Sequence, residues 1–233
     1  MSEPRGVALR YLGHSAVELG AGGHVVLIDP FITHNPAAPV KQEELSPTFI
    51  VVTHAHGDHW GDTEALSRRS GAVVISSAEI SGHASSLGLQ AHGMNLGGSH
   101  AFDFGRVRFT PAWHSSSFGD GRYGGMPMGV VLEMGGVRLY HAGDTALFSD
   151  MGLIGARGLD VALLPIGDNY TMGPDDAIEA VKLLKPRRVI PIHFNTFPLI
   201  AQDAAEFKRR VEAETEAWCT PLAPGESLQL QPS

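Results

Sequence analysis

The sequence predicts an α/β sandwich in which two β-sheets pack together beneath outer helices. Short apolar runs typical of strands are broken by Gly, Asn and Asp, and helical periodicity occurs in fewer segments. Strands, then a helix, then strands and helices again follow one another, and this order occurs twice along the chain. A chain of 233 residues with 43% hydrophobic and 18% charged residues can bury a sizeable core. We therefore expect one domain over residues 1–233.

Ten segments have the composition and length of β-strands. Two pairs of them, in "ELGAGGHVVLIDP" and "VVLEMGGVRLYHAGD", are expected to form hairpins, because each pair surrounds two glycines where a tight turn needs positive φ. The predicted strands are residues 7–12, 16–19, 25–28, 49–53, 73–76, 107–113, 129–134, 137–141, 161–166 and 189–193.

Helices are predicted in four segments. The clearest begins at Pro174, is followed by two aspartates, and ends near Lys182 and Lys185, which is the charge order that a helix dipole favours. Residues 30–47 contain four prolines and are expected to form one long irregular loop. The predicted helices are residues 60–69, 78–87, 174–185 and 203–214.

Charge and cysteine content restrict the partners and the compartment. The formal net charge is −8, without the basic stripe that displaces counterions from nucleic acid, so such a partner is disfavoured. No apolar run approaches the ~20 residues of a membrane-spanning helix. The first ten residues lack the apolar centre of a signal peptide, and Cys219 is the lone cysteine. We expect a cytoplasmic protein that acts on a small molecule, and a homo-oligomer stays open.

The stretch "VVTHAHGDHWGD", residues 51–62, places three histidines and two aspartates behind an apolar run. If that run is a buried strand, His54 and His56 lie in the turn beyond its end. Asp58 and His59 then fall at the start of the next helix. Four such ligands do not fit one tetrahedral ion comfortably, and they suit two adjacent ions. Burying this polarity without an ion would cost several kcal/mol, which favours metal binding.

Three further candidate ligands occupy equivalent places in the chain. His114, Asp144 and His193 each lie at or just beyond the carboxyl end of a predicted strand, where open α/β sheets gather their sites. Two ions about 3.5–4 Å apart would be bridged by a carboxylate and a hydroxide. Asp144 is the natural bridging carboxylate.

The motifs "HAHGDH" and "HAGDT", with a histidine between them and another after a late strand, resemble the metallo-β-lactamase superfamily. "YLGHS", "IDP", "GDNYTMGPDDA" and "IPIHFNTFP" narrow the resemblance to small metal-dependent hydrolases related to L-ascorbate-6-phosphate lactonase and N-acylphosphatidylethanolamine phospholipase D. The resemblance covers nearly the whole chain and implies a four-layered αββα fold. It also implies a first metal on His54, His56 and His114, and a second on Asp58, His59 and His193, with Asp144 shared.

The resemblance also indicates residues around the ligands. Asp29 in "LIDP" corresponds to an acidic residue that steadies the ligand loop, and a plain turn aspartate is the alternative. His14 in "YLGHS" corresponds to a histidine that looks towards the metals, where it would contact substrate or orient the nucleophile. A hydrogen-bonded turn histidine is the alternative for His14. For His141, three residues before Asp144, a buried strand histidine is favoured over a role beside the metals.

The expected reaction is hydrolysis, because two cations without redox-tuned thiolates activate water. Asp58 is expected to accept the proton of that water and pass it to the leaving group. Zinc is the first choice of metal, and Mn, Fe or Ni would also fit the ligands. A small organic ester, lactone, amide or phosphodiester is the expected substrate. Arg122, in the glycine-rich stretch 115–129, is either solvent-exposed or an anion anchor. A non-hydrolytic di-metal redox or sensing protein is the alternative function.

Overall fold

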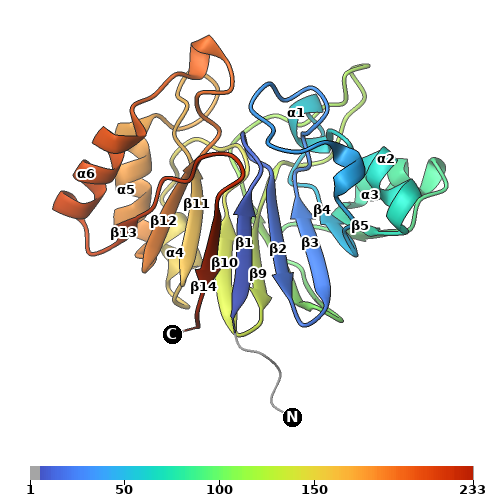
Figure 1. The fold of residues 1–233 in the computed structure, drawn as a ribbon, viewed down its shortest axis with the longest axis horizontal. Helices are drawn as coiled ribbons and strands as arrows, with labels where there is room; N and C mark the ends of the chain where they lie inside the picture. Colours follow the sequence, from blue (N-terminus) through green and yellow to red (C-terminus); the bar gives the residue numbers. More distant parts are fainter. Residues whose placement is uncertain (1–5, 233) are drawn as a thin grey trace.

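The fold is an αββα sandwich, as the sequence predicts. The structure is a computed structural model, and it describes residues 6–232. Two seven-stranded sheets pack face to face, and helices cover the outer face of each (Figure 1). The apolar cluster between the sheets includes Leu9, Leu19, Val107, Leu132 and Ile190, all almost fully buried. This inner cluster joins both halves of the chain.

The first sheet has the strand order β14-β1-β2-β3-β4-β5-β6. Strands β3 to β6 run parallel, and β14, β1, β2 and β3 pair antiparallel with their neighbours. The β2–β3 hairpin turns at Gly22 and Gly23, which have φ values of 58° and 82°, as the glycine pair predicts. The strands are β1 (Val7–Tyr11), β2 (Val17–Ala21), β3 (His24–Ile28), β4 (Phe49–Val51), β5 (Val73–Ser77), β6 (Ala91–Met94) and β14 (Ser227–Leu230).

The second sheet repeats this plan with the order β13-β12-β11-β10-β9-β8-β7. Its strands β7 to β10 pair antiparallel, and β10 to β13 run parallel. The predicted β9–β10 hairpin is present, again with two glycines of positive φ. The strands are β7 (Ser99–Phe102), β8 (Gly105–Pro111), β9 (Met128–Met134), β10 (Val137–His141), β11 (Val161–Pro165), β12 (Arg188–Ile192) and β13 (Trp218–Cys219).

Helices pack on the two outer faces through separate apolar clusters. On the first sheet, Leu66 of α2 (Thr63–Ser70) and Ile80 of α3 (Ala78–Ser86) join one cluster. The cluster on the second sheet contains apolar residues of α4 (Met151–Gly155), α5 (Pro174–Leu184) and α6 (Ala204–Glu214). Helices α5 and α6 therefore flank one side of the molecule in Figure 1, and α2 and α3 flank the other.

The predicted helix over residues 60–69 is wrong in its bounds, because the chain forms two helices there. Helix α1 (Gly57–Trp60) ends at Gly61, and α2 follows it. Gly61 has a φ of 42°, and a Cβ atom at this position would lie 2.4 Å from the carbonyl oxygen of Pro30. The chain therefore turns sharply where Pro30 crosses it, and no side chain fits.

Several short elements were not predicted. Strands β6, β7, β13 and β14 and helix α4 are five residues long or shorter. Residues 30–47 are irregular as expected, except for the 3-10 turn η1 (Gln42–Glu44), and η2 (Pro198–Ile200) is a second such turn. In β7, three of four residues are exposed, so the alternation of apolar and polar residues that marks a strand is absent.

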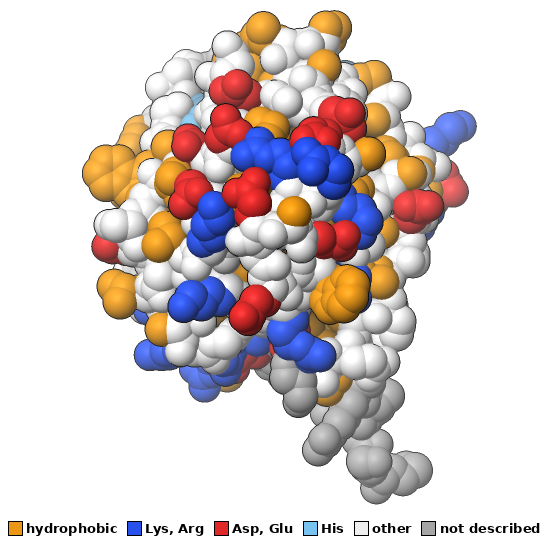
Figure 2. Space-filling view, turned by 90° about the vertical axis from the view of Figure 1, so that its left-hand side faces the viewer, with side chains coloured by type: hydrophobic (Ala, Val, Ile, Leu, Met, Phe, Trp, Pro, Cys, Tyr) orange, Lys and Arg blue, Asp and Glu red, His pale blue; other side chains and the backbone are white. Residues whose placement is uncertain are grey.

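The basic segments near α5 and α6 are interleaved with acidic side chains. Figure 2 shows blue and red side chains intermixed on this face of the molecule. Lys182 contacts Glu214 across the two helices at 3.1 Å, and Arg210 pairs with Asp175. No helix within residues 6–232 has both the length and the hydropathy to cross a membrane.

The topology brings the predicted ligands to one edge of the sandwich. Strands β1, β3, β4, β8, β10 and β12 all have their carboxyl ends at this edge, because they run in the same direction within their sheets. The loops that follow these strands, together with α1, meet there (Figure 1). This edge, called the metal edge below, contains all the predicted ligands.

Candidate metal centre

All seven predicted ligands lie close together at the metal edge. In each of three groups, every pair of candidate ligand atoms is within 4.8 Å. Two of the groups have His54 in common and two have His59 in common, so the three groups form one continuous cluster. The groups are His54, His56 and His114; His54, His59 and Asp144; and His14, Asp58, His59 and His193.

The first group is formed by the turn after β4 and the loop after β8. The Nε2 atom of His54 lies 3.0 Å from Nδ1 of His56. The ring centroid of His114 lies 5.2 Å from that of His54 and 5.1 Å from that of His56. The three rings converge on one point with a nitrogen from each. Three nitrogens with one open position are a common ligand set for a catalytic zinc ion.

Asp29 orients ligands of both predicted metals. Its Oδ2 atom accepts a hydrogen bond of 2.7 Å from the Nδ1 atom of His59, which leaves Nε2 of His59 facing the cluster. Asp29 also accepts bonds from the backbone amide and the hydroxyl of Thr53, at 2.8 and 2.7 Å. The Thr53 hydroxyl oxygen lies 3.0 Å from Nδ1 of His54, so it fixes that ring in the same way.

Asp144 occupies the centre of the cluster. Its Oδ1 atom lies 3.3 Å from Nε2 of His59. Its Oδ2 atom lies 3.1 Å from Nε2 of His193 and 3.6 Å from Nε2 of His114. The carboxylate is therefore adjacent to ligands of both predicted sites, which is the position that a bridging ligand requires.

His14 is buried inside the cluster. The backbone oxygen of His14 accepts a bond of 2.7 Å from the amide of His193, which joins the two halves of the fold. Its Nδ1 atom lies 2.8 Å from the hydroxyl of Thr196, and its Nε2 atom lies 3.1 Å from Oδ2 of Asp58. His14 thus occupies a turn, with a φ of 58°, and also faces a predicted ligand.

His141 has a structural role. Its Nε2 atom lies 2.9 Å from the carbonyl oxygen of Ser15, and its Nδ1 atom accepts a bond of 3.1 Å from the amide of Gly143. Both ring nitrogens are therefore used by the backbone, and His141 belongs to none of the three ligand groups. These bonds hold the turn that carries Asp144 against the turn that carries His14.

Two residues of the site were not singled out from the sequence. Thr53 precedes the histidine motif, and Thr196 follows His193 by three residues. Threonine is common in turns, so neither residue type gives a signal by itself. The position of Thr53 between a strand and the first ligand is the one cue that the sequence offers.

Burial and neighbouring charges shift the pKa values of several groups in the cluster in opposite directions. Burial lowers the pKa of His54 well below its ordinary value, so this ring is neutral and able to bind a cation. Burial also lowers the pKa of His59, but the carboxylates of Asp144 and Asp29 outweigh it and raise the pKa well above its ordinary value. Burial raises the pKa of Asp144, but His59 and His193 together hold it well below its ordinary value.

Several ligand atoms in the cluster are buried without a hydrogen-bond partner among the described residues. They include Nε2 of His59, Oδ1 of Asp144 and Nε2 of His193. Leaving such groups unpaired costs about 1–3 kcal/mol each, so buried polar atoms are rarely left in this state. Their convergence on one point fits a divalent cation, and nitrogen with carboxylate oxygen is a donor set that suits zinc.

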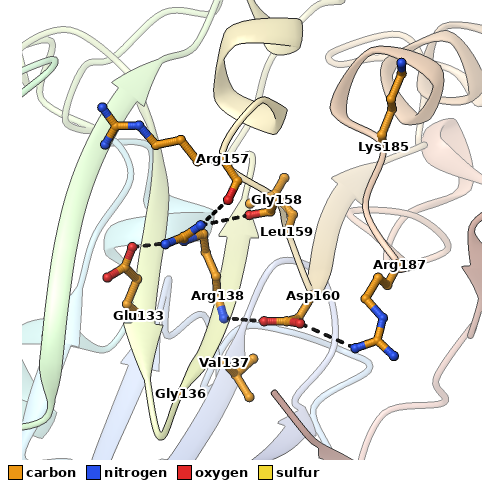
Figure 3. A pocket seen from close by; sticks show the side chains of 10 residues that line it. All are labelled: Glu133, Gly136, Val137, Arg138, Arg157, Gly158, Leu159, Asp160, Lys185 and Arg187. Atoms are coloured by element: carbon orange, nitrogen blue, oxygen red, sulfur yellow. Dashed lines mark hydrogen bonds and ion pairs between the residues drawn. The ribbon is translucent and has the colours of Figure 1, made fainter. Parts of the chain in front are cut away.

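The cavity in Figure 3 is a separate feature at the opposite end of the strands. It has a volume of about 410 Å3 and lies beside the β9–β10 turn and the starts of β11 and β12. Arg138 bonds to Glu133 at 2.9 Å within it, and Arg187 pairs with Asp160 at 3.6 Å. This cavity contains none of the predicted ligands.

Comparison with known proteins assigns the chain to a family. Residues 24–194 match the family model described as the β-lactamase superfamily domain. The matched region contains all seven predicted ligands and ends at the residue after His193. The chain belongs to the metallo-β-lactamase superfamily. Within that superfamily, it is 57% identical over 225 residues to a UPF0173 metal-dependent hydrolase of Thermus thermophilus, with 96% of this chain and 99% of the relative covered.

Solved structures agree with this assignment. A metallo hydrolase from the archaeon Ignicoccus hospitalis superposes with a TM-score of 0.90 at 40% identity, over 98% of this chain and 100% of its own. CmlA, a diiron β-hydroxylase from Streptomyces venezuelae, has a TM-score of 0.75 at 16% identity, over 97% of this chain and 55% of its own. The likeness to CmlA concerns the fold alone. The likeness to the Ignicoccus metallo hydrolase, together with that to the Thermus relative, identifies this chain as a metal-dependent hydrolase.

Proposed function

We propose that the chain is a hydrolase with a dinuclear centre that acts on a small organic ester, lactone or phosphodiester. His54, His56 and His114 would hold the first ion. Asp58, His59 and His193 would hold the second, and Asp144 would bridge the two. The observation that carries this proposal is the position of Asp144, whose oxygens lie within 3.6 Å of nitrogens of both ligand sets.

Two divalent ions at this centre would lower the pKa of a bridging water, so that hydroxide exists near neutral pH, and would polarise the scissile bond. Zinc fits the donor set first, and Mn, Fe or Ni are the alternatives. The chain's own residues supply the geometry. Asp29 fixes the ring of His59 directly and that of His54 through Thr53. Such partners commonly change metal affinity by about 10–100-fold.

Asp58 is the proposed proton carrier. Its side chain is 33% exposed, more than those of Asp144 and His193, so it faces the solvent side of the centre. Burial raises the pKa of Asp58, but the hydrogen bond from His14 and the charge of His59 hold it below its ordinary value. Asp58 is therefore ionised at neutral pH, as a proton acceptor must be. His14, held by Thr196, would orient Asp58.

The alternative function is a non-hydrolytic di-metal redox or sensing protein. The fold is compatible with it, since the diiron β-hydroxylase CmlA has a similar fold. The histidine-rich ligand set and the metal-dependent hydrolase of Thermus at 57% identity favour hydrolysis.

The buried Cys219, without a second cysteine in the chain, supports a reducing compartment such as the cytoplasm.

Elemental analysis and a substrate screen test the proposal together. We expect close to two metal ions per chain after reconstitution, and hydrolysis of at least one class among chromogenic esters, lactones and phosphodiesters. The same samples should give no redox signal on electron paramagnetic resonance that changes with substrate. Protein that stays metal-free with Zn, Mn, Fe and Ni would contradict the dinuclear centre.

A further inference from the structure

Exposed apolar side chains are concentrated at the metal edge. Of the nine large hydrophobic residues that are exposed within the described part of the chain, six lie on loops of this edge. Trp113 is 69% exposed, and Phe197 is 40% exposed. Because single exposed apolar residues are normal, this concentration on one edge is the informative feature. The six are Trp113, Tyr123, Met126, Tyr170, Phe197 and Leu199.

Two of these residues lie next to residues of the candidate metal centre. The ring of Phe197 packs edge-on against that of His14, with centroids 5.7 Å apart, and His14 faces Asp58. Trp113 directly precedes His114 in the chain. Its backbone amide bonds to the hydroxyl of Thr145 at 2.9 Å, beside the bridging candidate Asp144. Of the two, Phe197 has a side-chain contact with the residues of the centre, and Trp113 is joined to it through the backbone.

The ligands that are partly exposed show where the centre opens. The side chains of Asp58 and His114 are 33% and 14% exposed, whereas those of Asp144 and His193 are nearly buried. Phe197 packs against His14, and His14 contacts Asp58, so Phe197 lies beside the more exposed of these two ligands.

Positive charge is scarce at this opening. On the loops of the metal edge, the described residues include two basic side chains outside the histidines, Lys41 and Arg122. Arg122 pairs with Asp120 at 2.7 Å and stacks over the ring of Phe118. Lys41 adjoins Gln42, which bonds to Arg69 in the last turn of α2, away from the opening. Asp120 and Asp168 are exposed on the same edge.

Sites that act on phosphate groups usually add arginine or lysine to the metal ions, since these donors match the phosphate oxygens. An apolar opening instead favours a substrate without charge, because its apolar part loses contact with water on binding. We propose that the substrate is an uncharged ester or lactone with an apolar group that packs against Phe197 beside the metal centre. The proposal rests on the hydrolase function above and selects among its substrate classes.

A matched substrate series tests it on the metal-loaded protein. The series contains 4-nitrophenyl acetate, butyrate and octanoate, with bis(4-nitrophenyl) phosphate as the anionic comparison. We expect kcat/KM to rise with acyl length. A higher kcat/KM for the intrinsically less reactive phosphodiester than for the octanoate would contradict the proposal. Phe197→Ala should lower kcat/KM for the octanoate by about tenfold, with little change for the acetate. Leu153→Ala, which removes an exposed apolar side chain on α4, should change neither.

Binding gives a second readout that does not depend on turnover. Hexanophenone is an uncharged ketone analogue of an ester, and ethyl phenylphosphonate is an anion of similar size. Calorimetry should show that the ketone binds more tightly than the phosphonate. The affinity for the ketone should fall by about tenfold in Phe197→Ala and should not change in Leu153→Ala. Tighter binding of the phosphonate, or an unchanged ketone affinity in Phe197→Ala, would overturn the proposal. If the protein binds no metal, or hydrolyses none of these substrates, the hydrolase function is refuted instead. The comparison of ketone and phosphonate affinities would still test whether the opening prefers an uncharged apolar molecule.

Discussion

At the scale of single residues, hydrogen bonds from neighbouring side chains fix the orientation of the candidate ligands. The carboxylate of Asp29 accepts the Nδ1 proton of His59, and the Thr53 hydroxyl connects Asp29 with His54. Each ring is therefore held with Nε2 towards the cluster. Asp29 therefore connects a candidate ligand of each proposed metal site, although it belongs to none of the three ligand groups.

Replacing Asp29 tests this role. Asp29→Asn keeps the size of the side chain but places a donor where Thr53 and His59 both need an acceptor. We expect the metal affinity to fall by about 10–100-fold. Competition against a chromogenic chelator measures the affinity, with Asp120→Asn at an exposed surface carboxylate as the control. Equal affinities in the two variants would show that Asp29 is an ordinary turn residue.

Asp58 gives a prediction about catalysis. Asp58→Asn removes the proton acceptor while it preserves the shape of the side chain, so turnover should fall by about 10²–10⁴-fold. The measurement is kcat on a confirmed substrate, with metal content determined in the same preparation. Full turnover at normal metal content would assign the proton transfer to another group.

The convergence of the seven candidate ligands could be predicted because residue type and strand-end position agree in the sequence. His54 and His56 follow an apolar run, and the other ligands lie at equivalent places. Thr53 and Thr196 could not be predicted as partners. Their roles depend on distances between segments that are remote in the chain, such as the 2.8 Å between Thr196 and His14. A single sequence contains no direct signal for such a contact.

At the scale of elements, the loop after β8 is packed tightly against the ligand turn. The backbone amide of Ala55 donates to the hydroxyl of Ser116 at 3.2 Å, and the amide of Gly124 donates to the carbonyl of Ser116 at 3.0 Å. A Cβ atom on Gly124 would lie 2.2 Å from the Cβ atom of Ala55. Glycine is therefore required where this loop crosses the turn between His54 and His56.

Gly124→Ala should displace the loop from the ligand turn. We expect the free energy of unfolding to fall by about 1–3 kcal/mol, as for overpacked positions, and the first metal to bind more weakly than the second. Urea unfolding and metal titration measure the two effects. Gly119→Ala is the matched control, because Gly119 lies in the same loop and a Cβ atom there would meet nothing within 4 Å. Two variants with the same stability and metal affinity would contradict the close packing.

Long apolar elements were predictable, and short or exposed ones were not. All ten predicted strands are present with bounds that differ by two residues or fewer, because each has buried residues on at least one face. Strands β7, β13 and β14 are exposed edge segments whose pairing depends on a neighbouring strand. The break at Gly61 depends on contact with Pro30, so the local helical pattern could not indicate it.

At the scale of the whole molecule, the two halves of the fold meet at the metal edge and depend on its charge state. Burial lowers the pKa of His14 to about 4, and burial also lowers the pKa values of His54, His56 and His114. Below pH 6.5, these rings take up protons more readily in the unfolded chain than in the folded one. Stability without metal is therefore present above pH 6.5 and is lost as the pH falls.

The metal-stripped protein should accordingly be less stable at pH 5 than at pH 7. His14 alone would contribute a loss of about 3 kcal/mol by pH 4. His59, whose pKa is raised, acts in the opposite direction: its contribution is fully present below pH 6.5 and decreases as the pH rises, so it offsets part of the loss from the four histidines with lowered pKa values. Urea unfolding at both pH values measures the difference, and His14→Gln should reduce it. Equal stability at pH 7 and pH 5 would contradict the buried neutral state of these histidines.

In the proposed centre, one carboxylate contributed by the second sheet joins two metal sites whose ligands come from both sheets. Metal titration calorimetry on Asp144→Ala and His114→Ala tests this bridge. Because Asp144 lies beside ligands of both sites, Asp144→Ala should weaken the binding of both ions, whereas His114→Ala should mainly empty the first site. If Asp144→Ala binds two ions as tightly as the parent protein, Asp144 is not the bridge and the dinuclear mechanism is wrong.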